Sequence, residues 1–146
     1  MSKIQGLPKQ IPAKELPFKF EEKGTLTGHT YKGDFVAKVP GTREMSQIGI
    51  ELAKLNGGVK FEDLDSGTAV LHNAIAYLRI VLVDAPEWFT DRDEGLDYGL
   101  NADDANIPIQ IFSQAEQLVT DWRLNLMGKA REQEKSETTK RKQSDN

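Results

Sequence analysis

Eight carboxylates lie between residues 84 and 104, and an acidic segment of this kind is the first place to look for a metal. Oxygen ligands bind Ca²⁺ tightly when they follow the fixed spacing of a calcium loop. Asp91 and Asp93 begin such a loop, but Leu96 stands where glycine is needed and Ala102 where the final glutamate belongs. We therefore predict no metal site and interpret the segment as a solvated acidic loop.

No other group of side chains forms a catalytic pattern. Cysteine is absent, which excludes thiolate nucleophiles, disulfides and Cys-ligated zinc. His29 and His72 have no partner at ligand spacing, and no nucleophile elbow, HExxH, Walker or GxGxxG motif occurs. We interpret both histidines as structural and predict a protein that is not an enzyme and uses no cofactor. The third-ranked alternative, a small metal-dependent enzyme, would bind Ca²⁺ or Mg²⁺ through Asp91 and Asp93.

Large aromatic side chains are the remaining candidates, and their chemistry is recognition. Trp88 and Phe89 follow the proline that ends a long apolar segment, while Phe112 and Trp122 stand in the last predicted helix. Aromatic residues, and tryptophan above all, are enriched at the hot spots of protein interfaces. We hypothesise that these four residues bind a partner. The alternative is that they complete the core of the domain itself.

The first element that must position these aromatics is a small antiparallel β element over residues 17–40. Phe18 and Phe20 alternate with charged residues, and a similar two-residue alternation runs through residues 31–39. Alternation of aromatic and β-branched residues is typical of half-buried strands. We predict two or three strands, with a bulge near Gly33.

Three helices are predicted to follow. The first spans about 43–55, with Thr42 as its cap, and the second, with Asp65 or Ser66 as its cap, includes 69–83. The third begins at Asn106 as N-cap and ends near residue 127. Because the second helix is apolar on two stripes, it must be covered on more than one side and is expected at the centre of the domain.

The predicted fold class is therefore α+β, a small N-terminal antiparallel β element followed by a three-helix domain with disordered termini. Residues 1–16 read as a flexible, Pro-containing arm, residues 17–127 as a single α+β domain, and residues 128–146 as a disordered charged tail.

Charge and hydropathy narrow the classes of partner. The net charge is −4, and both ends are basic, so the body between them is acidic. We expect no nucleic acid partner, because binding to phosphates needs Lys and Arg. The longest strongly apolar run, Ile80–Val83, is far shorter than the roughly 20 residues of a membrane helix, and no secretory signal is visible. We therefore expect no membrane association.

The order of motifs resembles the tail assembly chaperones of long-tailed bacteriophages. It consists of an FxF strand, the strand TYKGDFVAKVP, a helix ending in LAKLNGG, the segment LDSGTAVLHNAIAYLRIVLVDAPEWF, and an acidic loop before a closing helix. The likeness covers roughly residues 17–127. LAKLNGG, residues Ala74–Phe89 and the closing helix carry it best.

This resemblance implies a helper that is absent from the virion and acts in the cytoplasm of the infected bacterial host. Such proteins bind the long, hydrophobic tape measure protein, keep it soluble and help recruit the major tail protein to build the tail tube. Self-association is left open. Many have a longer form made by programmed frameshifting, for which the Lys-rich end of this chain, residues 134–142, is the expected place. The alternative is a structural virion subunit, such as a neck, tail or capsid accessory protein.

Overall fold

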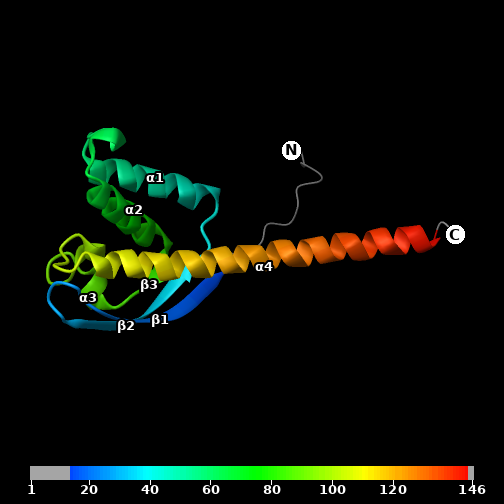
Figure 1. Cartoon of the computed structure of the whole chain (residues 1–146), viewed down its shortest axis with the longest axis horizontal. Coiled ribbons are helices and arrows are strands. Elements are labelled where there is room, and N and C mark those ends of the chain that lie inside the picture. Colours follow the sequence, from blue (N-terminus) through cyan, green and yellow to red (C-terminus); the bar gives the residue numbers. More distant parts are fainter. Residues whose placement is uncertain (1–13, 145–146) are drawn as a thin grey trace, which may run out of the picture.

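The computed structural model describes the backbone of residues 14–144 and the side chains of residues 14–136. Most of the predicted N-terminal arm, residues 1–16, thus lies outside the described residues. The elements are β1 (Glu15–Lys23), β2 (Thr30–Lys38), α1 (Thr42–Asn56), η1 (Phe61–Asp63), α2 (Ser66–Val81), β3 (Leu82–Asp84), α3 (Glu87–Thr90), η2 (Asp97–Gly99) and α4 (Asn106–Ser144). They form a mixed α+β fold with a three-stranded antiparallel sheet and four helices (Figure 1).

The sheet has the order β1-β2-β3. β1 and β2 pair without interruption from Glu15↔Lys38 to Lys23↔Thr30. The alternation predicted both strands, but β1 begins at Glu15, two residues inside the predicted arm, because Glu15 and Leu16 pair with the end of β2.

β3 pairs with Val36 and Ala37, near the C-terminal end of β2. The end of the apolar segment forms this strand, where the sequence predicted that the helix continues. The predicted bulge near Gly33 is wrong, because the irregularity lies between Val36 and Ala37.

The two faces of the sheet differ sharply. Phe20, Phe35 and Ala37 are buried on the inner face. On the outer face, oppositely charged residues stand across from each other, as in the pairs Lys19↔Asp34 and Glu21↔Lys32. Opposite charges in facing positions stabilise a pair of strands and discourage further association of an exposed sheet.

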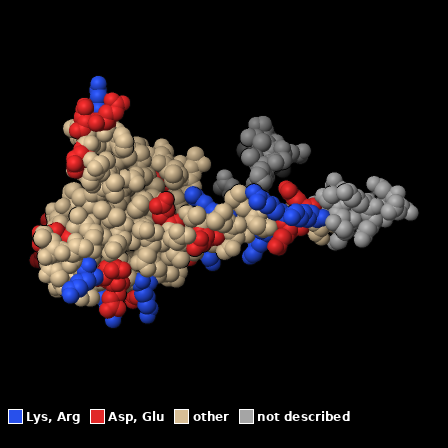
Figure 2. All heavy atoms as spheres, viewed as in Figure 1, with Lys and Arg blue, Asp and Glu red and all other residues tan. Residues whose placement is uncertain are grey.

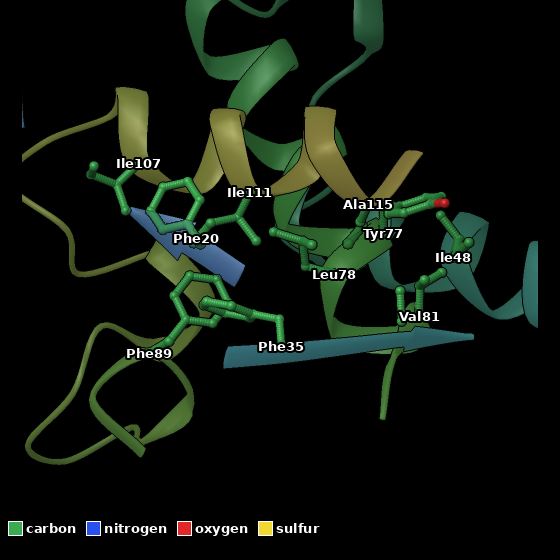
Figure 3. Packing of buried hydrophobic residues seen from close by; sticks show 12 residues of the cluster. Phe20, Phe35, Ile48, Tyr77, Leu78, Val81, Phe89, Ile107, Ile111 and Ala115 are labelled. Carbon is green, nitrogen blue, oxygen red and sulfur yellow. The ribbon is translucent and has the colours of Figure 1, made fainter. Parts of the chain in front are cut away.

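One apolar core joins the sheet to the helices. α2 lies at its centre, as predicted, with Ala74–Leu78 and Val81 buried, although Val70 near the start of the helix is 51% exposed. α4 runs between the α1–α2 hairpin and the sheet in the view of Figure 1. Side chains from the sheet and from all four helices meet in the core, among them Phe20, Phe35, Ile48, Tyr77, Leu78, Val81, Phe89, Ile107, Ile111 and Ala115 (Figure 3).

Helix ends largely follow the expected signals. α1 ends at Gly57, which adopts the left-handed conformation with φ 59° and donates its N–H to the Ala53 carbonyl. Asp65 caps α2 by accepting the backbone N–H of Thr68 at 3.2 Å. The predicted cap of α1 is different, because Gly41 holds that position and no side chain caps the helix.

The last helix is much longer than predicted. α4 continues through Gly128 as one helix of 39 residues, where the sequence predicted a disordered tail from residue 128 (Figure 1). Low apolar content led to that prediction. However, residues 129–135 consist of Lys, Ala, Arg, Glu and Gln, which are strong helix formers even where they contact no core. Residues 145–146 lie outside the described part.

Two glycines make room for proline rings. A Cβ on Gly33 would lie 2.3 Å from Cγ of Pro86, and a Cβ on Gly99 would lie 2.4 Å from Cβ of Pro108. The first contact seats the segment before α3 on the sheet. The second seats the first turn of α4 on η2, where Gly99 has φ 104°.

In the part of the chain that the structure describes, no helix is long and apolar enough to cross a membrane.

Candidate functional site

The indole of Trp88 lies at the surface, against the sheet. Its Nε1–H donates to the backbone carbonyl of Lys32 at 3.2 Å, and its ring centroid lies 5.7 Å from that of Tyr31 and 6.2 Å from that of Phe35. The side chain is half-buried. One part of the ring therefore completes the core while another faces solvent, as the partner-binding hypothesis requires.

Phe89 is fully buried, so the prediction that it contacts a partner is wrong. Its ring centroid lies 5.5 Å from that of Phe35 (Figure 3) and 5.7 Å from that of Tyr98. Adjacent residues on a helix point about 100° apart. The single turn of α3 thus sends Phe89 into the core and leaves Trp88 at its edge.

Phe112 and Trp122 lie on α4, away from α3 in the chain and on a different element. Phe112 is half-buried and makes an edge-to-face contact with Tyr77, with ring centroids 5.0 Å apart. Trp122 is also half-buried. The four predicted partner-binding residues therefore do not form one site.

A pocket does open beside Trp88, and we call it the Trp88 pocket. Its volume is about 420 Å³. It is lined by His29, Thr30, Tyr31, Lys32, Trp88, Glu94, Gly95 and Leu96. A neighbouring hollow of about 260 Å³ shares Trp88, Glu94 and Gly95 and adds Glu87 and Asp91.

The acidic segment that forms one side of this pocket is a turn held by internal hydrogen bonds, whereas the sequence predicted a solvated loop. Oδ1 of Asp91 accepts the backbone N–H groups of Asp93 at 2.7 Å and Glu94 at 3.1 Å, and these bonds lower the pKa of the Asp91 carboxyl. The N–H of Leu96 donates to the Trp88 carbonyl at 2.9 Å. Among the described residues, no three or more His, Cys, Asp or Glu side chains are placed to hold a metal ion.

A buried carboxylate supports the other side of the pocket. Asp104 is 1% exposed and accepts hydrogen bonds from Leu26 N (2.7 Å), Thr27 N (2.9 Å), Thr27 Oγ1 (2.5 Å) and Tyr31 Oη (2.8 Å). The Thr27 hydroxyl does most to lower the pKa of Asp104, to about 2, while burial opposes this effect. Sequence reasoning missed this residue, because it counted Asp104 among the acids of the loop.

The side chain of Asn106 also joins the start of α4 to the β1–β2 turn, although the sequence predicted it as a helix cap. Its side-chain oxygen accepts from the backbone N–H of Thr25 at 3.1 Å, and its amide nitrogen donates to the Lys23 carbonyl at 3.1 Å. The start of α4 thereby fixes the β1–β2 turn. That turn precedes His29 and Tyr31 in the pocket wall.

The two histidines have ordinary neighbours. Nδ1 of His72 lies 3.0 Å from Oδ1 of Asn56, which joins α2 to the end of α1. The ring of His29 packs edge-on against Tyr31 at 5.1 Å. These contacts agree with the structural interpretation of both residues.

Exposed apolar side chains form a second candidate surface at the point where α4 leaves the body. Arg123 donates to the Pro40 carbonyl at 2.6 Å and ties the helix to the chain segment before α1. Leu124, Leu126 and Met127 follow at once, with exposed fractions of 59%, 36% and 51%. We call residues 124–144 the helical arm and these three residues its apolar root. Figure 2 shows charged side chains of both signs along the helical arm beyond the body.

Comparison with models of protein families, with curated proteins and with solved structures gives no significant match.

Proposed function

We propose that this chain is a tail assembly chaperone of a long-tailed bacteriophage. It binds the tape measure protein in the host cytoplasm, keeps it soluble, and promotes assembly of the tail tube from the major tail protein. The motif order over residues 17–127 supports the choice of family. The apolar root of the helical arm carries the physical part of the proposal, because its side chains are exposed and apolar on a helical segment that is otherwise mostly polar.

The apolar root suits an amphipathic helical client. Burial of a leucine or methionine side chain that is half exposed contributes about 1 kcal/mol, so the two that share one helix face, Leu124 and Met127, offer a modest affinity. A client helix that packs along α4 would cover Leu124 and Met127, which lie three residues apart on one face, as in helix-in-groove recognition. The charged residues that follow stay in water and help keep the complex soluble.

Co-expression with the tape measure protein tests the proposal. Wild-type chain is expected to move the client from the pellet to the soluble fraction. The double variant Leu124→Ser/Met127→Ser is expected to lose most of this effect while its thermal unfolding stays unchanged. Leu26→Ser is the matched control, because Leu26 is a leucine that is 77% exposed in the β1–β2 turn.

Two outcomes would contradict the proposal in different ways. A client that stays insoluble with the wild-type chain would contradict the chaperone function. A root variant that solubilises the client as well as wild type would contradict the assignment of the helical arm as the binding surface.

A structural virion subunit is the second candidate, and the helical arm is the observation that favours it. A helix of 39 residues that extends beyond its own domain can also pack between neighbouring subunits. Mass spectrometry of purified particles separates the two functions. A structural subunit is present in stoichiometric amounts, whereas a chaperone is absent.

A further inference from the structure

We propose that the Trp88 pocket binds an arginine side chain of a partner protein, with the guanidinium against the aromatic wall and paired with Glu94. This inference goes beyond the proposed function, because it concerns a surface other than the helical arm and does not depend on which protein supplies the arginine. It rests on three features of the pocket, namely the orientation of its rings, its charge and its size.

The rings of Tyr31 and Trp88 are fixed by their own polar atoms. The Tyr31 hydroxyl donates to Asp104 at 2.8 Å, and the Trp88 Nε1–H donates to the Lys32 carbonyl at 3.2 Å. Both polar groups are thus used inside the protein, and the rings lie 5.7 Å apart with 46° between their planes. What they offer to the pocket is aromatic surface, to which a flat cation is attracted.

The charge around the pocket favours a cation. Glu94 lines both the pocket and the neighbouring hollow, and Glu87 and Asp91 line that hollow as well. Among the described residues Glu94 has no salt bridge, since the nearby Arg92 instead approaches Asp97 at 3.7 Å. The glutamate is therefore available to a guanidinium, with which a carboxylate can form two parallel hydrogen bonds.

One cation of the chain also lines the pocket. Lys32 supplies the carbonyl that accepts the Trp88 indole. Along β2 it alternates with Tyr31 and stands opposite Glu21 on the outer face of the sheet. Successive side chains of a strand point to opposite faces, so the Lys32 side chain leaves β2 on the face opposite to Tyr31, where Glu21 stands across from it.

The pocket is large enough for one side chain. Its volume of about 420 Å³ falls at the lower end of the range of small-ligand sites, roughly 300–1,000 Å³. Leu96 adds an apolar surface for the methylene groups that carry the guanidinium. The pocket therefore has room for an arginine side chain presented by another protein.

A peptide titration followed by NMR tests this inference on the full-length chain. The probes are acetyl-Gly-Arg-Gly-amide and the same peptide with citrulline, which keeps the shape of arginine but has no charge. The indole N–H signal of Trp88, assigned with Trp122→Phe, is expected to shift saturably with the arginine peptide. The citrulline peptide is expected to bind at least ten-fold more weakly.

Two variants locate the interaction. Glu94→Gln is expected to weaken binding of the arginine peptide about five-fold, because the binding free energy of one exposed ion pair corresponds to at most about this change in affinity. Glu62→Gln removes an exposed acid in η1, outside the pocket, and should leave the affinity unchanged. Equal binding of the two peptides, or an unchanged affinity in Glu94→Gln, would overturn the inference. A lysine peptide that binds as tightly as the arginine peptide would overturn the role given to the flat guanidinium.

Neither the client nor the helical arm takes part in this titration. Its failure would leave the proposed chaperone function standing, and failure of the co-expression test would leave the pocket standing.

Discussion

At the scale of single residues, Asp104 shows how one buried charge organises distant parts of the chain. Its carboxylate accepts three hydrogen bonds from the β1–β2 turn and a fourth from the hydroxyl of Tyr31. Burial of a charge costs free energy unless hydrogen bonds replace water, and four of them do so here. The arrangement leaves no room beside it, because a Cβ on Gly24 would lie 2.1 Å from Oδ2 of Asp104.

The lowered pKa of Asp104 makes stability depend on pH in acid. Its pKa is about 2 in the folded chain, against about 3.9 for an unfolded aspartate. The unfolded state therefore binds the proton first as pH falls. The stabilisation is fully present above about pH 4 and is lost as the pH falls through about 2. Urea midpoints measured between about pH 5 and pH 2 should fall more steeply in wild type than in Asp104→Asn.

Asp103→Asn is the matched control, because Asp103 is the exposed neighbour in the sequence. Its acid dependence should equal that of wild type. If Asp104→Asn also kept the wild-type slope, Asp104 would not be the group that titrates.

The same residues show why the site could be predicted only in part. Trp88 and Phe89 are adjacent aromatics, and Asp103 and Asp104 are identical adjacent acids. Which member of each pair is buried depends on how α3 and the start of α4 sit against the sheet. The orientation of these two segments is set by contacts between distant parts of the chain, such as that of Tyr31 with Asp104, and the local sequence carries no signal for it.

At the scale of elements, the helical arm is the segment whose structure was predicted least well from amino-acid composition. Few apolar residues follow Met127, which is the signature of a segment without a core of its own. The segment nevertheless continues a helix that is already nucleated and packed, so each added residue needs only to propagate it. Figure 1 shows the described part of the helical arm running beyond the sheet and the α1–α2 hairpin.

Gly128→Pro tests whether the helical arm is one helix with the body. Proline removes a backbone hydrogen bond and clashes with the preceding turn, at a cost of about 3 kcal/mol in a helix interior. Ellipticity at 222 nm and the maximum dimension from small-angle scattering should both fall. The urea midpoint followed by tryptophan fluorescence should change little, because the core lies before residue 120.

Gly128→Ala is the companion variant. A Cβ at this position meets nothing within 4 Å, so alanine should raise helix content and stabilise the helical arm by about 1 kcal/mol. A scattering profile that is the same for wild type, the alanine variant and the proline variant would contradict a continuous helix.

An element could be predicted where the residue pattern that specifies it lies within the element itself. β1 and β2 were predicted apart from the first two residues of β1, because buried and exposed positions alternate along each strand. β3 was missed, because Leu82 and Val83 extend the apolar helix pattern and become a strand only through pairing with β2. Pairing with a remote strand overrode local preference.

At the scale of the whole molecule, a chain of charges joins the α1–α2 hairpin to the acidic turn. Arg79 on α2 lies 3.5 Å from Glu51 of α1 and 3.3 Å from Asp97 of η2. Arg79 and Asp97 are only 14% and 13% exposed, so solvent screens their interaction weakly. This contact couples the helical hairpin to the segment that also builds the Trp88 pocket.

Arg79→Met should destabilise the fold by about 2 kcal/mol, because it keeps the aliphatic stem but leaves the partly buried Glu51 and Asp97 with only the exposed cations of Lys54 and Arg92 nearby among the described residues. Arg92→Met is the control, since Arg92 approaches the same Asp97 at 3.7 Å but is 77% exposed, and it should cost about 0–0.5 kcal/mol. Urea unfolding measures both. Equal losses in the two variants would contradict the dominant role of Arg79.

The two glycine–proline contacts of the fold have a consequence for how this chain can diverge. Any residue larger than glycine at position 33 or 99 would place a carbon within 2.4 Å of the ring of Pro86 or Pro108. Neither glycine can therefore change alone. Loss of Pro86 would remove the clash at position 33, but at position 99 the φ of 104° favours glycine whatever residue stands at 108. In related chains we expect positions 33 and 86 to be exchanged together as a covarying pair, and glycine to be kept at position 99.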